Sequence, residues 1–413
     1  MRKSPTGPRR SWLSRTLVVL CGVSFLQDAA SEMLYPVLPL FLTGTLGAPV
    51  VVVGLVEGSA EGIASIAKVV AGRRADRFRR RPLIAIGYGL AAAGKAVIAV
   101  ATGWPAVLAG RGIDRLGKGI RGAPRDALLM DGVQVSDRGK VFGFHRAADT
   151  AGAVVGPLIG LALYQLLDHQ IRPLLVVAVV PAVASVLLVL AVREARTQPE
   201  PAPAIRMGTP TSASSGAAAQ PGGLPTVFWR TALPLGVFSL VNFPDALLLI
   251  RAHALGLSVA QVIGVYVLYN AVYTAASYPA GALSDRWPPQ RVIAAGWGCF
   301  ALTYIGLGVV SDVRFVWPLF AVYGIFTAAT DGVAKAWVST TVPASLQGSA
   351  QGTFAGLSGA AVLIAGLWAG LAWGDSGRAP LIISGTISLI IGIALATRRS
   401  NPVTGIGRPV DAT

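Results

Sequence analysis

The residues of this chain that could do chemistry are charged groups inside long apolar segments. Asp28 and Glu32 lie four residues apart in one segment, and Glu57 and Glu61 lie four apart in the next. On a helix, this spacing puts both members of a pair on one face. A charged side chain costs roughly 2.5 to 3.5 kcal/mol at the centre of a membrane helix, so it is retained there for a reason. Neighbouring carboxylates in a low-dielectric cavity cannot easily both ionise, which makes these pairs candidates for proton binding.

A second group of charged residues lies in the segments that follow. The stretch RGIDRLGKGIRGAPRD carries Arg111 and then Asp114 and Lys118, which are four residues apart and opposite in sign. The next segment opens with FGFHRAADT, in which His145 and Asp149 are also four apart. For three charged residues near the end of the first stretch we expect a solvated or structural role: Arg121, Arg125 and Asp126.

The second half of the chain carries fewer such charges. Asp331 and Lys335 form a pair of opposite sign, and NFPDALLLIR contains Asn242 and Asp245. We therefore expect the first half to bind protons and the second to supply more of the shape and apolar contact for a substrate. The candidates for proton coupling or substrate binding are Asp28, Glu32, Glu57, Glu61, Arg111, Asp114, Arg115, His145, Arg146, Asp149, Asn242, Asp245, Asp331 and Lys335.

The composition indicates a membrane protein. Of the 413 residues, 53% are hydrophobic and only 13% are charged, well outside the range of soluble domains. In a soluble protein, the net charge of +16 would suggest a nucleic-acid partner. Here the basic residues fall in every second loop between apolar segments, which is the positive-inside pattern. We therefore expect the lipid bilayer, and no nucleic acid, as a partner, with both termini in the cytoplasm.

Twelve apolar segments are each about the ~20 residues that an α-helix needs to cross a bilayer. The predicted fold is therefore an all-α membrane protein with twelve transmembrane helices in two six-helix halves. A stretch rich in Pro, Ala, Ser and Gly between the sixth and seventh segments is typical of a flexible linker. The predicted organisation is a tail at 1–15, a six-helix bundle at 16–192, a cytoplasmic linker at 193–230, a second bundle at 231–397 and a tail at 398–413.

A basic turn separates the second and third segments. GRRADRFRRR, from Gly72 to Arg81, carries six arginines, and a degenerate copy, GALSDRWPPQR, lies about 210 residues later. The first copy resembles the signature G-x-x-x-D-R-x-G-R-R of the major facilitator superfamily, with Arg79 in place of the second glycine. The resemblance implies a latch, in which the aspartate of the turn faces the start of the eleventh span. The latch residues would be Gly72, Asp76, Arg77, Arg80, Arg81, Gly281, Asp285 and Arg286.

The fifth segment carries a glycine motif. Glycines four residues apart form a smooth helix face that another helix can approach closely, and a proline bends the helix. The pattern resembles G-x8-G-x3-G-P-x2-G-G of superfamily exporters that exchange substrate for protons, although leucine replaces the last glycine. In the fourth segment, Arg111 matches the position of an arginine of the superfamily, and this resemblance implies a coupling role for it. Other segments of the first half are similar to a bacterial subgroup, which implies the inner membrane. The motif residues are Gly143, Gly152, Gly156, Pro157 and Gly160.

We therefore expect a proton antiporter that exports a small molecule by alternating access and works as a monomer. Substituting Glu57 or Glu61 by Gln should then abolish gradient-driven transport. The sequence contains no phosphate-binding G-x-x-x-x-G-K-[ST] loop, so the expected energy source is the proton gradient, with no cofactor, no bound metal and no enzymatic activity. Proton-coupled uptake and export of a divalent metal through carboxylates and His145 stay open. A receptor or scaffold without transport activity is disfavoured, because it has no need of buried charge.

Overall fold

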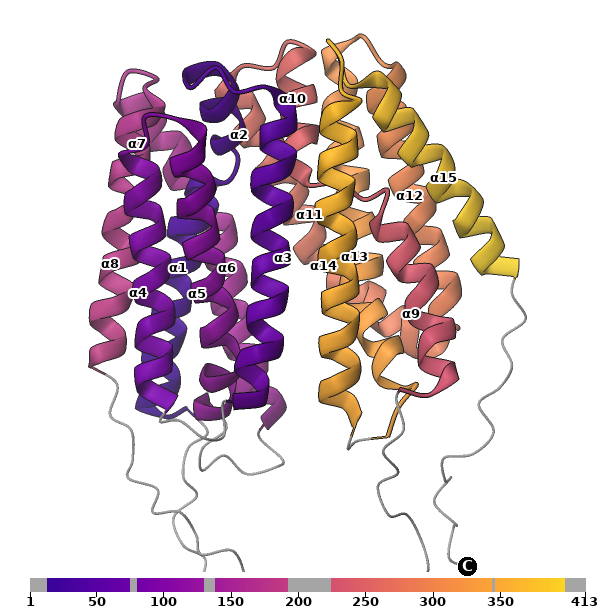
Figure 1. Ribbon diagram of the computed structural model, residues 1–413, viewed down its shortest axis with the longest axis horizontal. Coiled ribbons are helices and arrows are strands. Elements are labelled where there is room, and N and C mark those ends of the chain that lie inside the picture. The colour runs from indigo at the N-terminus through magenta and orange to yellow at the C-terminus, as the bar shows by residue number, and fades with distance from the viewer. Residues whose placement is uncertain (1–12, 75–79, 130–137, 192–223, 344–345, 398–413) are drawn as a thin grey trace, which may run out of the picture.

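The computed structural model describes residues 13–74, 80–129, 138–191, 224–343 and 346–397, and every regular element within these ranges is a helix. The helices stand side by side in two groups (Figure 1). We call the end of the bundle where the first helix begins and the last helix ends the termini end, and the opposite end the far end. The predicted all-α fold in two halves is confirmed.

The first half packs α1 against α6 and α8, and α5 against α3 and α4. Its first span is interrupted, because α1 ends at Leu34 and a short helix and a π-helix complete the crossing after Pro36. The elements are α1 (Arg15–Leu34), α2 (Leu38–Leu40), η1 (Phe41–Thr45), α3 (Val50–Arg74), α4 (Arg80–Ala99), α5 (Trp104–Leu129), α6 (Arg138–Leu166), α7 (Ile171–Val177) and α8 (Val179–Leu190).

The second half packs α12 against α13 and α15, and α11 against α13. Its first helix begins at Thr226, five residues before the predicted start of this bundle, and Phe228 in its first turn is fully buried. The elements are α9 (Thr226–Ser239), α10 (Asp245–Ala254), α11 (Val259–Arg286), α12 (Pro289–Val309), η4 (Val313–Phe315), α13 (Val316–Ser339), α14 (Gln347–Leu371) and α15 (Arg378–Thr397).

Ten candidate spans in the described residues are long and apolar enough to cross a membrane. Two of the twelve predicted spans are not among these ten, and each has a physical reason. One is α5, whose many Arg, Lys and Asp residues make it too polar by composition. The other is the seventh span, which is divided into α9 and α10, each shorter than a membrane crossing. Both exceptions lie in the spans that carry predicted site residues.

The break between α9 and α10 is held by hydrogen bonds from side chains. Pro244 precedes α10 and has no backbone N–H with which to continue a helix. Nε1 of Trp368 on α14 donates to the carbonyl of Leu240 over 2.8 Å, and the Tyr304 hydroxyl donates to that of Phe243 over 3.3 Å. Irregular backbone at membrane depth is tolerated where protein or a cavity surrounds it, as in the discontinuous helices of transporters. The first and seventh spans thus have related interruptions.

Glycines bring two pairs of helices into close contact. On α6, a Cβ added to Gly152 would lie 2.6 Å from the carbonyl oxygen of Phe25 on α1, and one added to Gly156 would lie 2.5 Å from that of Ala29. The predicted close approach to another helix is confirmed at these two residues, and α1 is the partner. A second contact joins the two halves, because a Cβ on Gly54 of α3 would lie 2.0 Å from the Gly366 carbonyl oxygen on α14. We call this α3–α14 contact the glycine seam.

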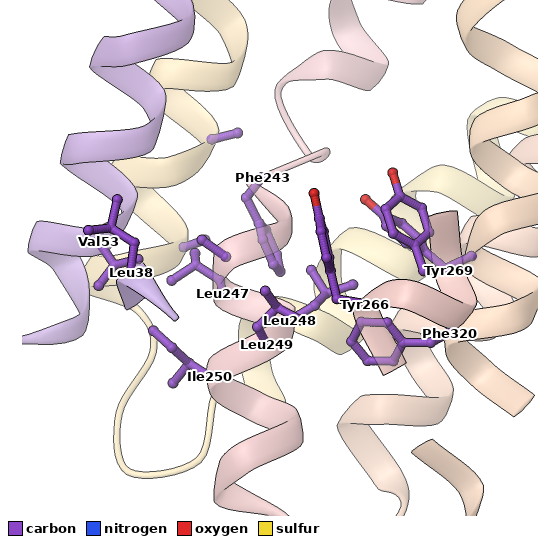
Figure 2. Close-up of a cluster of buried hydrophobic side chains, with 14 of the residues drawn as sticks. Leu38, Val53, Phe243, Leu247, Leu248, Leu249, Ile250, Tyr266, Tyr269 and Phe320 are labelled. Atoms are coloured by element: carbon purple, nitrogen blue, oxygen red, sulfur yellow. The ribbon is translucent and has the colours of Figure 1, made fainter. Parts of the chain in front are cut away.

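A hydrophobic cluster connects the two halves near the far end. Figure 2 shows Leu38 and Val53 of the first half beside Phe243 and Leu247 of the second, with Tyr266 of α11 close by. All of these side chains are buried. The cluster therefore holds the two interrupted spans together on the far-end side of the molecule.

Candidate functional site

Four charged residues form a network inside the first half. Glu57 accepts two hydrogen bonds from Arg111, from Nε at 3.0 Å and from Nη2 at 2.5 Å. Asp114 accepts a bond from Lys95 Nζ over 2.8 Å and lies 3.7 Å from Nη1 of Arg111. All four residues are at most 7% exposed. We call this set the buried charge network; its two acids and two bases balance each other, which is how charges are accommodated at membrane depth.

Sequence reasoning found three members of this network and missed Lys95. It also paired Asp114 with Lys118 four residues along the same helix, whereas the described ion pairs join Asp114 to Lys95 on α4 and to Arg111. Lys118 is instead exposed at the wall of a cavity. The sequence did offer a signal for Lys95, because this lysine stands alone in the apolar run GLAAAGKAVIA. Such a lysine needs a partner, although the sequence does not say which one.

A cavity of about 490 Å³ lies between the two halves. We call it the central cavity. Its walls come from α1, α3, α5 and α6 of the first half and from α11 of the second, and its lining includes Asp28, Lys68, Lys118, Arg121, Asp149 and Tyr273. Lys68 lies near the end of α3 and Arg125 near the end of α5, so the cavity extends toward the termini end. An adjoining cavity of about 440 Å³ shares Thr150 with it and includes Asp331.

Two buried polar atoms of residues that line the central cavity lack hydrogen-bond partners among the described residues. One is Oδ1 of Asp149, and the other is Nη1 of Arg121, a residue that is only 5% exposed. The guanidinium of Arg121 stacks on the ring of Tyr88 at 4.3 Å, which fixes its position. Arg121 was expected to have a solvated or structural role; its burial contradicts the solvated role, and its stacking on Tyr88 agrees with a structural one.

The other charged residues near the cavity interact over longer distances. Asp28 interacts electrostatically with Asp149 of α6 and with Lys118, Arg121 and Arg125 of α5. Arg125 also binds Asp126, at 3.0 Å, and so neutralises it. Glu61 interacts with Arg115, Lys68 and Lys118 in the same way. Each of these carboxylates therefore has positive charge nearby.

A layer of tyrosines closes the far-end side of this region. The hydroxyl of Tyr266 on α11 donates to Oε2 of Glu32 on α1 over 2.5 Å, so this bond joins the two halves. Tyr323 donates to Asp245, the first residue of α10, over 2.6 Å. Neighbouring ring centroids are 5.2 to 6.1 Å apart through the layer, which consists of Tyr35, Tyr266, Tyr269, Tyr323 and Tyr304. The two predicted carboxylates Glu32 and Asp245 thus belong to the two interrupted spans and lie next to their breaks.

We expect Tyr266→Phe to weaken closure of the far end. The lost hydrogen bond to a carboxylate contributes roughly 1.5 to 3 kcal/mol and is made only while the halves meet there. Spin labels at the exposed positions Thr45 and Ala254, in a chain with both cysteines replaced, should report a larger population of long distances. Tyr278→Phe on the same helix, 84% exposed, is the matched control. Identical distance distributions for the two variants would contradict this expectation.

Other predicted residues occupy separate positions. Nε2 of His145 lies 3.0 Å from the Ser24 hydroxyl, and Arg125 donates to the same hydroxyl over 3.3 Å. Asp331 pairs with Lys335 at 2.5 Å, as predicted, and accepts a bond from Tyr273. Asn242 lies in the break between α9 and α10. Within the described residues, no group of three or more His, Cys, Asp or Glu is arranged to hold a metal ion.

Much of the predicted latch lies outside the described residues. Asp76 and Arg77 fall in 75–79. Only the places in their helices are described for Gly72, Asp285, Arg146 and the motif residue Gly143. Four latch residues are described. Arg80 and Arg81 begin α4, where Arg81 donates a hydrogen bond to the carbonyl of Leu190, while Gly281 lines the adjoining cavity and Arg286 is the last residue of α11. Of the glycine motif, Pro157 lies within α6, and Gly160 of the same helix approaches Met33 of α1. The latch stays a prediction.

Comparison with known proteins decides the family. The family model of the Major Facilitator Superfamily matches residues 20–250 and 238–412, which is nearly the whole chain. The chain belongs to this superfamily. An uncharacterised MFS-type transporter of Methanocaldococcus jannaschii is 29% identical over 390 residues, covering 93% of this chain and 94% of the relative. The predicted resemblance is therefore confirmed for the superfamily, and the protein is a multi-pass membrane protein of a transporter family.

This MFS protein is also similar to a multidrug resistance protein in part of its sequence and to a solved transporter structure in its fold. The multidrug resistance protein MdtH of Photorhabdus laumondii is 33% identical over 137 residues, about a third of each chain. The crystal structure of a bacterial homologue of the human lysosomal transporter Spinster, inward-facing and unoccupied, has a TM-score of 0.70 at 15% identity. It covers 94% of this chain and 96% of its own. The structural likeness supports the MFS fold of twelve helices in two halves.

Proposed function

We propose that this MFS protein is a secondary active transporter that exports a small molecule in exchange for protons. The pair Asp28 and Asp149 is the observation that carries this function. They lie on α1 and α6 at the wall of the central cavity, interact electrostatically, and belong to no ion pair among the described residues. Two carboxylates that share a low-dielectric site do not easily both ionise, which makes this pair a candidate for proton binding.

Other carboxylates are less suited to this role. Glu57 is held by two hydrogen bonds from Arg111 inside the buried charge network, away from the cavity lining. Glu32 is held by Tyr266 in the tyrosine layer. Glu61 has Arg115, Lys68 and Lys118 nearby and does not belong to the lining of the central cavity. We therefore assign proton exchange to Asp28 and Asp149 in place of the expected Glu57 and Glu61. Protonation of the pair would favour one orientation of the two halves, and substrate would compete for the ionised pair.

The extent of the cavity supports export. It reaches toward the termini end, and the tyrosine layer closes the far-end side. The basic loops favour a cytoplasmic termini end in a bacterial inner membrane, so substrate would enter from the cytoplasm. The partial similarity to MdtH, a multidrug resistance protein, agrees with export. Like other members of this fold, the chain would work as a monomer by alternating access.

A vesicle assay tests the exchange. Inside-out vesicles are energised to an acid interior and read with a fluorescent pH probe, while antibiotics, lipophilic cations, organic acids, amino acids and divalent metals are added in turn. We expect at least one class to dissipate the gradient with the wild-type protein. Asp28→Asn should lower that response more than tenfold, because a neutral amide cannot exchange a proton. Asp312→Asn, in an exposed pair, is the control and should respond as wild type.

Two outcomes would overturn the antiport function. One is a full response of both Asp28→Asn and Asp149→Asn. The other is a substrate whose uptake into whole cells rises with the proton gradient, which would establish symport. A response to divalent metals alone would identify a metal as the substrate.

A further inference from the structure

The central cavity carries unsatisfied groups of both signs. Oδ1 of Asp149 needs a hydrogen-bond donor, and the buried Nη1 of Arg121 needs an acceptor. Both atoms are buried on residues that line the cavity, and buried polar atoms are nearly always hydrogen-bonded, so each of these side chains has an unused hydrogen-bonding group beside the space where a ligand would lie. Because one atom is an acceptor and the other a donor, a single ligand that satisfies both must carry both kinds of group.

The charges at the wall divide by helix. The acidic groups Asp28 and Asp149 come from α1 and α6, whereas Lys68, Lys118 and Arg121 come from α3 and α5. Lys68 and Lys118 are exposed, and the described residues offer neither of them an ion pair. The remaining pair at the wall, Arg125 with Asp126, satisfies itself. The cavity thus presents two acidic and three basic side chains that a ligand could pair with.

The second half faces these charges with neutral groups. Asn270, Tyr273 and Thr274 of α11 complete the lining and provide amide, phenol and hydroxyl groups. The volume of about 490 Å³ lies within the range of small-molecule sites, ~300 to 1,000 Å³. A ligand would therefore place its charges on the first half and its neutral part against α11.

We propose that the substrate is amphoteric, a small organic molecule that carries a cationic amine together with a carboxylate or another anionic group. The amine pairs with Asp28 and Asp149, and the anionic group pairs with Arg121 and Lys118. This substrate class rests on the proposed antiport, since the amine and the proton compete for the same carboxylates. A simple cation leaves Arg121 unsatisfied, and a simple anion leaves Asp149 unsatisfied.

Equilibrium binding to the purified full-length protein tests the substrate class. The probes are phenylalanine, phenylalanyl-phenylalanine and ciprofloxacin, each as the zwitterion, with the amine acylated, and with the carboxyl amidated. We expect the zwitterion of at least one scaffold to bind at least tenfold more tightly than both of its singly charged forms. Zwitterions that never bind better than a singly charged form of the same scaffold, or that fail to bind at millimolar concentration, would overturn the proposal.

Single substitutions test which residue recognises each charge of the zwitterion. Arg121→Gln should remove the tighter binding of the zwitterion relative to its amidated form. Asp149→Asn should remove the tighter binding of the zwitterion relative to its acylated form. Lys118→Gln is an exposed second variant for the case that the buried Arg121 is needed for folding. Arg314→Gln, in an exposed ion pair distant in sequence from the cavity residues, should bind as wild type. Unchanged ratios in both Arg121→Gln and Lys118→Gln would overturn the assignment.

Binding is measured without a proton gradient, so it separates this inference from the proposed function. A zwitterion that binds tightly but moves no protons in vesicles would retain the amphoteric site and remove antiport. Proton exchange driven only by singly charged compounds would retain antiport and remove the amphoteric site.

Discussion

Arg111→Met is expected to lower the free energy of unfolding by about 3 to 5 kcal/mol. Arg111 binds Glu57 with two hydrogen bonds and lies beside Asp114, and all three side chains are buried. Removing it leaves two carboxylates with Lys95 as their only cation in the network. Breaking a buried pair by deleting one partner is costly for that reason, whereas replacing a whole pair by apolar groups is often neutral.

The chain offers a matched control for this substitution. Arg314 also pairs with an aspartate, at 2.7 Å, but its side chain is 86% exposed. Exposed pairs contribute little, so Arg314→Met should leave thermal unfolding in detergent unchanged. Adding Glu57→Gln to Arg111→Met should recover part of the loss, because the two residues interact directly. Equal unfolding temperatures for Arg111→Met and Arg314→Met would refute a stabilising role for the network.

Gly366→Val is expected to lower transport per folded molecule by more than tenfold. A Cβ on Gly366 would lie 2.5 Å from the carbonyl oxygen of Gly54 on α3, so a branched side chain must force α3 and α14 apart. Because these helices belong to different halves, the substitution alters the contact about which the halves must move. Close helix approach at small residues is the main source of packing between membrane helices.

Gly356→Val on the same helix is the control for the seam. A Cβ at Gly356 would meet nothing within 4 Å, so the substitution adds the same side chain to open space. Initial transport rates of the substrate found in the vesicle assay, normalised to the monodisperse fraction in size-exclusion chromatography, should differ by at least tenfold between the two variants. Similar rates would mean that the closeness of the seam is not needed for transport.

The sequence predicted the spans better than their contacts. The lengths of the apolar runs predicted the spans, because the thickness of a bilayer sets them, and the linker and the second copy of the basic turn predicted the two halves. The contact between Glu57 and Arg111 could not be predicted, since it depends on how α3 and α5 are rotated about their axes. The glycines of the fifth span likewise predicted a close approach but not its partner, which is α1 for Gly152 and Gly156.

Residues near helix ends were the hardest to interpret. Arg121 was expected to be solvated because it lies near the end of its span. Helix α5 ends at Leu129, close to the expected end, yet Arg121 is buried because its guanidinium stacks on Tyr88 of α4. The burial of such a residue depends on which side chains of neighbouring helices face it, and the sequence does not contain that information. Lys95 was missed because its only nearby signal is its own charge.

The glycine seam also constrains how the protein is made. It joins Gly54 and Gly366, which are more than 300 residues apart, and α14 is the second-last helix of the described chain. Chains fold from the N-terminus during synthesis, and contacts between distant residues form late. The first half must therefore remain in the bilayer with the small-residue face of α3 against lipid until α14 is inserted. Truncation before α14 would leave that face without its partner, so this contact between the halves forms only once α14 is in place.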